Sequence, residues 1–530
     1  MSEARRVGLP ADALAKAGKI ARPVPESPHL APRTSHLVMP RRQLLLLVCL
    51  FLLSLPAVTP RIYSSDEIQY FAYLRSVWFD RDLSFENEYQ YFYDRGIARS
   101  DGFHETFLER TTDTGRRLNF ATIGCAILWS PFYLAGDVAA RVTGAPVDGF
   151  SKPYLAAIAY GSAVYGFLAV LLGILCAQRL GLNGAVAALA VWLGTPLFFY
   201  MYIAPPFSHA CSAFGVALFT YVWLRVRDEW STRGMIALGA AGALMAMVRE
   251  QDAFLVAGPA LDFLWSGLAR TRPTDVWEFE TGGRLARGRV AGVAGAAVAF
   301  TLVFIPQAVT YLILNGHLGP HASVARKMNW MAPHALQVLF SPAHGFLVWT
   351  PLALVALAGL FFLPPKGGSH GNEPERGNHK IQVADSAGSV FRNTNPVASA
   401  FGRQKQVGMC LLLMVALQIY VAGSVESWTV AGAFGQRRFI ALTAAMVIGY
   451  AALQQALSRT PARRALTIVT VLAVYWNLAL IAEFSAGLMD RQRLEPRKNA
   501  YDAFVTLPRM APSLVYRYLF DRTSFYKHGA

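Results

Sequence analysis

Long apolar runs constrain this chain more than any other feature of its sequence. About eleven runs, free or nearly free of charged residues, have lengths that let a helix cross most or all of a bilayer: 44–58, 154–177, 185–204, 207–224, 235–248, 253–265, 290–314, 345–363, 407–425, 439–456 and 465–482. Of the 530 residues, 54% are hydrophobic and only 15% are charged, which is unlike a soluble chain. We therefore expect an all-α polytopic membrane protein with about eleven transmembrane helices.

The composition also excludes other classes of protein. The formal charge of +16 does not indicate nucleic-acid binding, because Lys and Arg residues flank the apolar runs instead of forming one basic domain. They are expected to set the topology and to contact anionic membrane lipid. The cysteines lie in apolar surroundings without metal-ligand spacing, so we expect neither disulfides nor a zinc site; they are Cys49, Cys125, Cys176, Cys211 and Cys410.

The amino-terminal segment 1–42 is polar, proline-interrupted and basic. The positive-inside rule predicts that it is a cytoplasmic arm. It could instead be the start of a cleaved signal whose apolar region is 44–58, but it is long for that role and no small-x-small cleavage site follows. An uncleaved first span is the better interpretation.

The segment 120–140 decides the predicted topology. It is apolar, but Pro131 and Asp137 interrupt it. If it crossed the membrane, the arginine-rich loops at 225–233, 270–289 and 459–464 would all face outward, against the positive-inside rule. As an interfacial, non-crossing helix it leaves them in the cytoplasm, and the basic tail 491–527 alone opposes this arrangement. We expect a plasma (inner) membrane protein with a cytoplasmic amino terminus.

The spans divide the rest of the chain. A first bundle, 43–363, includes a long extracytoplasmic loop, 61–153, whose aromatic segments predict juxtamembrane helices at the lipid headgroups. Residues 364–406 are rich in Pro, Gly, Ser and Asn and predict a flexible cytoplasmic linker. A second bundle, 407–486, and an extracytoplasmic tail, 487–530, follow. The chain has no phosphate-binding loop, so an ATP-driven pump or an enzyme with its own nucleotide-binding domain is not expected.

Two adjacent acids, Asp66 and Glu67, directly follow the first span. Carboxylates at a low-dielectric boundary have raised proton affinity, so they can act as a general base or hold a cation. The alternative is that they only favour the start of the next helix, with Ser64 or Ser65 as its N-cap.

The predicted topology brings further polar residues to the same outer face, where they suggest a cleft with an acidic and a basic side. These residues are Asn119, His209, Arg249, Asp252, Lys327, Glu426, Arg437 and Arg438. Each has a simpler interpretation. Arg249 and Asp252 can pair locally, Arg437 and Arg438 can extend to headgroups, and His209 beside two prolines can be structural. The spacing of His317 and His321 does not match a known metal site.

With these residues in place, the chain resembles the GT-C superfold of integral-membrane glycosyltransferases, which includes protein O-mannosyltransferases, aminoarabinose transferases and oligosaccharyltransferases. The resemblance depends on the order and spacing of motifs from residue 44 to about 456. They are Tyr63-Ser64-Ser65-Asp66-Glu67 after the first span, Asn119-Phe120 to Pro131-Phe132 at the end of the first loop, Gly194 to Tyr200, Gly242 to Arg249, Ser341 to Gly345 and Phe434 to Phe439.

This resemblance implies inverting transfer of a sugar from a polyprenyl-phosphate donor to a glycan, lipid or protein acceptor outside the membrane. It implies Asp66 as the base, with Glu67 either holding the acceptor or assisting Asp66, and in some members such an acid binds a divalent cation. Arg249, Arg437, Arg438 and Lys327 are the candidates for binding the donor phosphate, because arginine can bond two phosphate oxygens at once. Asn119, His209, Asp252 and Glu426 would line the substrate cleft.

Two alternatives remain open. A secondary transporter or flippase would also need buried ions, but near the bilayer midplane and usually within an inverted repeat, which this sequence does not show. A ligase or polymerase acting on lipid-linked glycans would depend on outer-loop arginines and a histidine and would not need Asp66.

Overall fold

The structure is a computed structural model that describes residues 40–98, 100–270, 279–363, 396–430 and 432–525, with backbone alone at 268–270, 279–287, 396–401 and 523. Nearly all of the predicted arm 1–42 and most of the predicted linker 364–406 lie outside these ranges. Residues 37–530 form one compact unit.

The described chain is helical, and none of these residues forms a β-strand; two isolated bridges join Thr111 to Arg117 and Met328 to Val425. The first helices are α1 (Arg41–Ser54), α2 (Ser65–Arg75), α3 (Glu86–Asp94), α4 (Asp101–Phe103) and α5 (Gly124–Thr143). Next are α6 (Lys152–Arg179), α7 (Ala185–Gly194), α8 (Leu197–Tyr202), α9 (His209–Val226), α10 (Thr232–Val248), α11 (Ala257–Arg270) and α12 (Phe279–Asn315). The last are α13 (Ala322–Arg326), α14 (Ala335–Phe340), α15 (Phe346–Trp349), α16 (Pro351–Gly359), α17 (Pro396–Ser424), α18 (Thr443–Ala456), α19 (Ala462–Ala486), α20 (Pro496–Tyr501) and α21 (Leu507–Phe520).

Short turns of other helical types join these elements. The 3-10 turns are η2 (Leu55–Ala57), η5 (Glu250–Val256), η7 (Leu360–Phe362), η8 (Arg437–Leu442) and η10 (Arg522–Phe525). The π-helical turns are η3 (Ser76–Asp80), η4 (His104–Glu109) and η9 (Asp502–Thr506).

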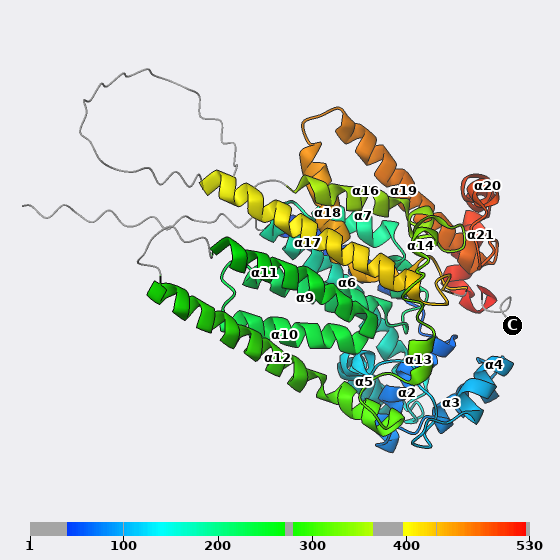
Figure 1. Cartoon of the computed structure of the whole chain (residues 1–530). Coiled ribbons are helices and arrows are strands. Elements are labelled where there is room, and N and C mark those ends of the chain that lie inside the picture. The colour runs from blue at the N-terminus through cyan, green and yellow to red at the C-terminus, as the bar shows by residue number, and fades with distance from the viewer. Residues whose placement is uncertain (1–39, 99, 271–278, 364–395, 431, 526–530) are drawn as a thin grey trace, which may run out of the picture. The chain divides into compact units, whose positions relative to one another are not determined.

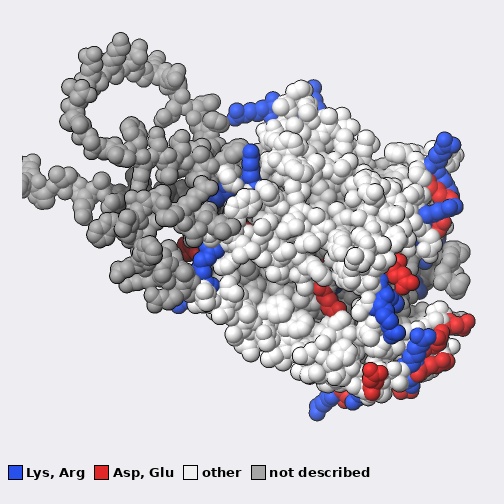
Figure 2. Space-filling model, viewed as in Figure 1, with Lys and Arg blue, Asp and Glu red and all other residues white. Residues whose placement is uncertain are grey.

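By length and composition, 6 helical segments of the described chain can cross a membrane: Lys152–Arg179, His209–Val226, Gly288–Asn315, Gly402–Ser424, Arg437–Ala456 and Ala462–Ala486. Shorter apolar helices cover Ala185–Gly194, Thr232–Val248 and Pro351–Phe362. The prediction of an all-α protein with several membrane helices is confirmed in this form. Figure 2 agrees, because a largely uncharged surface separates two ends that carry Lys and Arg.

Two of the predicted spans are not continuous helices. The run 185–204 divides into α7 and α8 at Thr195-Pro196, and the run 345–363 divides into α15 and α16 at Thr350-Pro351. Proline lacks an N–H group and disfavours a helical conformation of the residue before it, so each pair ends one helix and starts the next. The boundary of the predicted linker is also wrong, because α17 begins at Pro396 instead of near 407.

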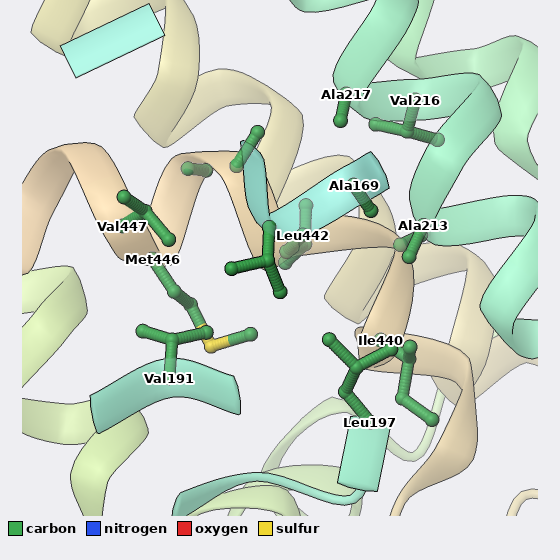
Figure 3. Packing of buried hydrophobic residues seen from close by; sticks show 14 of the residues in the cluster. Ala169, Val191, Leu197, Ala213, Val216, Ala217, Ile440, Leu442, Met446 and Val447 are labelled. Atoms are coloured by element: carbon green, nitrogen blue, oxygen red, sulfur yellow. The ribbon is translucent and has the colours of Figure 1, made fainter. Parts of the chain in front are cut away.

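The larger hydrophobic core joins helices from both sides of the predicted linker. Side chains of α6, α7 and α9 pack against η8 and α18, as Figure 3 shows for Ala169, Val191, Ala213, Leu442 and Met446. Small residues allow this close packing: a Cβ atom at Gly449 would collide with the carbonyl oxygen of Ala356 on α16. The structure therefore differs from the predicted division into two bundles, since 43–363 and 407–486 share one core.

A second, aromatic core lies mostly within the predicted outer loop and also includes Tyr154 of α6, Cys211 of α9 and Leu314 of α12. It combines α2, α3, η4 and α5, with Phe71, Tyr89 and Trp129 fully buried. The segment predicted to be an interfacial helix, 120–140, forms α5, which carries Pro131 within it and exposes Leu134, Val138 and Val142.

The carboxyl-terminal tail meets the end of the first helix. Tyr518 and Arg522 donate hydrogen bonds to the backbone carbonyl groups of Ala57 and Val58, respectively. Figure 1 shows α20 and α21 at the same end of the bundle as α2, α3 and α4. The tail therefore lies on the same side as the start of the loop 61–153.

Candidate active site

The two adjacent acids, Asp66 and Glu67, have different environments at the start of α2. Ser64 is the N-cap, and its hydroxyl accepts a hydrogen bond from the Glu67 backbone N–H (3.4 Å). The Glu67 carboxyl group accepts hydrogen bonds from the backbone N–H groups of Tyr63 (2.7 Å) and Ser64 (3.0 Å). This is a capping box, which satisfies backbone donors at the start of a helix. Glu67 thus has the capping role that the simpler interpretation gave to this region.

Glu67 is fully buried below this turn. Burial raises the pKa of the Glu67 carboxyl group to about 8, so it is largely protonated and neutral at pH 7. Its second oxygen has no hydrogen-bond partner among the described residues. Glu67 therefore stabilises the first turn of α2, which carries Asp66.

Asp66 faces the opposite way and meets a residue that is far from it in sequence. Its Oδ2 atom lies 2.8 Å from an Nη atom of Arg437, and the exposed fractions of the two side chains are 42% and 18%. The guanidinium group of Arg437 also lies over the ring of Phe207, 5.0 Å from its centroid. An acid at the start of α2 and an arginine of η8 thus meet where solvent reaches both.

The neighbouring Arg438 is held by backbone carbonyl groups. It is buried and donates hydrogen bonds to the carbonyl oxygens of Ser427 (3.1 Å) and Trp428 (3.4 Å). The turn before it needs the left-handed conformation of Gly435, whose φ is +57°. Arg438 therefore fixes the loop between α17 and η8 while it adds a positive charge beside Arg437.

Arg249, at the end of α10, completes the basic side. Its guanidinium group contacts the Nδ1 atom of His209 (3.4 Å) and donates a hydrogen bond to the side-chain oxygen of Gln251 (3.0 Å). His209 is buried and lies edge-on to Tyr200, with ring centroids 4.7 Å apart. Arg249, Arg437 and Arg438 all act electrostatically on His209. We call Asp66, His209 and these three arginines the arginine cluster.

The net charge of the arginine cluster indicates its ligand. Three guanidinium groups act on His209. In the part of the chain that the structure describes, Arg437 alone among them pairs with the Asp66 carboxylate, and Glu67 adds no charge near pH 7. The hydrogen-bond partners of Arg249 in the described chain are both neutral. Such a group of arginines suits an anion with several oxygens, above all a phosphate.

Two predicted cleft residues have structural contacts instead. Asn119 is buried, donates a hydrogen bond to the carbonyl oxygen of Gln69 (3.0 Å) and accepts one from the N–H of Ala121 (2.9 Å). Asp252 is buried in η5 and accepts a hydrogen bond from the Ser212 hydroxyl (2.5 Å). Burial raises the pKa of Asp252. These side chains connect the elements that carry the arginine cluster.

The other two predicted residues lie together in a neighbouring segment. The N–H of Glu426 donates a hydrogen bond to the carbonyl oxygen of Lys327 (2.8 Å), and the ammonium group of Lys327 lies over the ring of Phe120 at 5.4 Å. Within the described ranges neither side chain contacts the arginine cluster. The described structure therefore gives no contact between the arginine cluster and either Lys327, predicted as a phosphate ligand, or Glu426, predicted to line the cleft.

The aromatic residues around the cluster were not predicted. Tyr200 and Phe207 surround His209, and Tyr70 lies close enough to interact with Ser208, Arg249 and Asp66. Tyr70 could have been found, because it lies four residues after Asp66 and so shares its face of α2. Tyr200 and Phe207 come from another part of the chain, which spacing cannot place.

The acids at this site do not fit a divalent cation. Glu67 faces inward as a cap, and Asp66 is already paired with Arg437, whose charge repels a cation. Within the described ranges, no three His, Cys, Asp or Glu side chains are arranged to hold a metal ion.

No family model matches this sequence, and no curated protein is significantly similar to it.

Proposed function

We propose that this protein is a membrane glycosyltransferase that moves a sugar from a polyprenyl-phosphate donor to an acceptor hydroxyl group, with inversion at the anomeric carbon. The observation that supports the proposal is the contact between Asp66 and Arg437 within the arginine cluster. A base and a group of phosphate-binding cations then lie within reach of one substrate.

In this mechanism Asp66 accepts the proton of the acceptor hydroxyl group while its oxygen attacks the anomeric carbon. The bond between that carbon and the phosphate oxygen breaks, and the lipid phosphate leaves with the electron pair. Arg249 and Arg437 meet the negative charge as it develops on the leaving phosphate. A phosphate between these arginines also draws Arg437 from Asp66, which makes the carboxylate a better base.

The proposal includes the predicted membrane arrangement. About eleven crossings of a plasma membrane leave the amino terminus in the cytoplasm and the site on the extracytoplasmic face. The position of the cluster supports it, because Asp66, His209 and Arg249 lie at helix ends, where a lipid-linked phosphate meets water. A transporter would instead hold its ions near the bilayer midplane.

The test is transfer by the purified full chain in lipid vesicles, with a panel of polyprenyl-phosphate sugars as donors. Asp66→Asn removes the base with almost no change in shape, and Asp113→Asn is a matched control in an exposed turn of the same loop. We expect Asp66→Asn to lose transfer and Asp113→Asn to keep it. Full transfer by Asp66→Asn would reject Asp66 as the base.

One observation favours a second candidate function. His209 lies among three arginines, which is also what a ligase or polymerase acting on lipid-linked glycans would need. In that case Asp66→Asn would stay active on a diphosphate-linked glycan, while His209→Gln and Arg437→Gln would not.

A further inference from the structure

An apolar cavity of about 680 Å³ lies between α10, α11 and α12, away from the arginine cluster. One face of α10 lines it with Met235, Leu238, Gly239 and Gly242, whose spacing of three and four residues keeps them on the same side of the helix. Gly239 lets α10 pack directly against the backbone of α12, because a Cβ atom there would collide with the carbonyl oxygen of Ala296. Figure 1 shows these three helices next to one another.

The cavity opens sideways, toward the surface that the membrane would cover. Val256, Leu264 and Val293 line it and are exposed apolar residues. Because its rim and its walls are apolar, a hydrocarbon chain can enter from the bilayer without leaving an apolar environment.

Trp230 supplies one polar group in this apolar lining. It lines the cavity, is only 3% exposed and packs edge-on against Phe263, with ring centroids 5.0 Å apart. Its indole N–H has no hydrogen-bond partner in the described part of the chain. A buried donor without a partner lowers stability by about 1–3 kcal/mol, so a hydrogen-bond acceptor from a ligand at this position would be favourable. Its backbone has φ of +53°, which few non-glycine residues adopt.

The charges near Trp230 are mostly positive. The guanidinium group of Arg289 lies over the Phe263 ring, 4.1 Å from its centroid, and Arg225 and Arg233 are exposed on the adjoining ends of α9 and α10. Two acids, Asp228 and Glu229, are exposed nearby, and Asp228 lines a different pocket with Arg227 and Arg403. This surface favours an anionic headgroup.

We propose that this cavity is a binding site for an anionic glycerophospholipid, one acyl chain of which fills the cavity while its ester carbonyl accepts the Trp230 N–H. The headgroup phosphate then lies at the surface that carries Arg225, Arg233 and Arg289. Trp230 follows α9, and His209 begins it, so the lipid headgroup and the arginine cluster lie at opposite ends of a helix about 27 Å long. The lipid site is therefore independent of the proposed transferase activity.

The experiment uses tryptophan fluorescence of the full chain in phosphatidylcholine vesicles that contain brominated phosphatidylglycerol or, at the same fraction, brominated phosphatidylcholine. Bromine in the acyl chain quenches nearby indole rings. The chain has 11 tryptophans, so the signal of Trp230 is the difference between the wild type and Trp230→Phe. We expect brominated phosphatidylglycerol to quench this difference signal several-fold more than brominated phosphatidylcholine does. Equal quenching by the two lipids would overturn the proposal.

In a second experiment, a larger side chain fills the cavity. Ala260→Phe adds a ring within the lining, and Ala294→Phe adds the same ring at an exposed position of α12 that does not line the cavity. We expect Ala260→Phe to abolish the preference for phosphatidylglycerol and Ala294→Phe to keep it. A preference that survives Ala260→Phe would reject this cavity as the site.

If Trp230→Phe does not fold, native mass spectrometry replaces the fluorescence difference. The wild type and Ala294→Phe should each retain one more phosphatidylglycerol molecule than Ala260→Phe. Identical numbers of bound lipids in all three proteins would contradict the proposal.

Discussion

Two aspartate–arginine contacts, one near each end of α9, differ in burial and in the number of hydrogen bonds that each carboxylate receives. Near the end of α9, Arg227 binds both oxygens of Asp262 (2.8 and 3.0 Å), and Trp223 donates a third hydrogen bond (2.9 Å). The exposed fractions there are 10% and 2%. Near its start, Asp66 makes one contact with Arg437 and stays 42% exposed, beside two further arginines. A saturated pair holds helices together, whereas an unsaturated one leaves charge available to a ligand.

The largest effect should come from removal of the charge of Asp66. If Asp66 is the base, Asp66→Asn should lower the rate of sugar transfer by about 10²–10⁴-fold, since general-base catalysis contributes that much. Its thermal stability should change little, because the contact with Arg437 is partly exposed. Single-turnover transfer and a thermal melt measure the two effects. A variant that melts far earlier would show that this contact is structural after all.

An aspartate-to-asparagine substitution near the other end of α9 should lower stability and leave sugar transfer unchanged. Asp262→Asn leaves Arg227 buried without its opposite charge, which typically costs about 3–5 kcal/mol. We expect a clearly lower melting temperature in the purified protein and unchanged transfer per folded molecule. An unchanged melt would contradict the view that a saturated buried pair stabilises this bundle.

The third prediction concerns Arg249, whose hydrogen-bond partners in the described chain are His209 and Gln251. Arg249→Gln removes a charged hydrogen-bond donor whose loss costs about 1.5–3 kcal/mol, or roughly 10–100-fold in affinity for the donor lipid phosphate. The KM for the donor should rise by that factor, and inhibition by the polyprenyl-phosphate product should weaken in parallel. Arg464→Gln, at an exposed position near the start of α19 and outside both proposed sites, is the matched control. An equal rise in both variants would mean that Arg249 acts only through the general charge of the protein.

The sequence predicted that Asp66 and Arg437 lie on one face of the protein, but not their direct contact or the orientation of each side chain. Charge placement and the positive-inside rule were enough to bring Asp66 to the same face as Arg437. Asn119 and Asp252 have the same polar character in the sequence, yet both are buried. Asn119 bonds to backbone groups, and Asp252 accepts a hydrogen bond from Ser212 with one oxygen, while its other oxygen has no partner among the described residues. Burial depends on packing between distant segments, which a pattern of residue types does not contain.

The different orientations of Asp66 and Glu67 could have been predicted from the sequence. Ser64 and Glu67 have the spacing of a capping box, which turns Glu67 toward the backbone and leaves Asp66 outside. The breaks at Thr195-Pro196 and Thr350-Pro351 were also visible as prolines within apolar runs. Hydropathy alone hides such breaks, because it measures composition and not hydrogen bonding.

The smallest predicted effect is a pH dependence of the protein's stability that distinguishes Glu67 from Asp66. Because the folded protein raises the pKa of Glu67 from 4.5 to about 8, the folded state keeps a proton that the unfolded state loses in this range. Stability should therefore fall as pH rises toward 8, by at most about 1.4 kcal/mol per pH unit for one proton. Glu67→Gln keeps an oxygen to cap the helix but cannot ionise. Its melting temperature should therefore rise relative to that of the wild type as the pH increases from about 6 to about 8. Glu229→Gln, at an exposed position, should follow the wild type throughout. If the curves of Glu67→Gln and the wild type run parallel, Glu67 is already ionised in the folded protein, and both acids would then share the charge that faces Arg437.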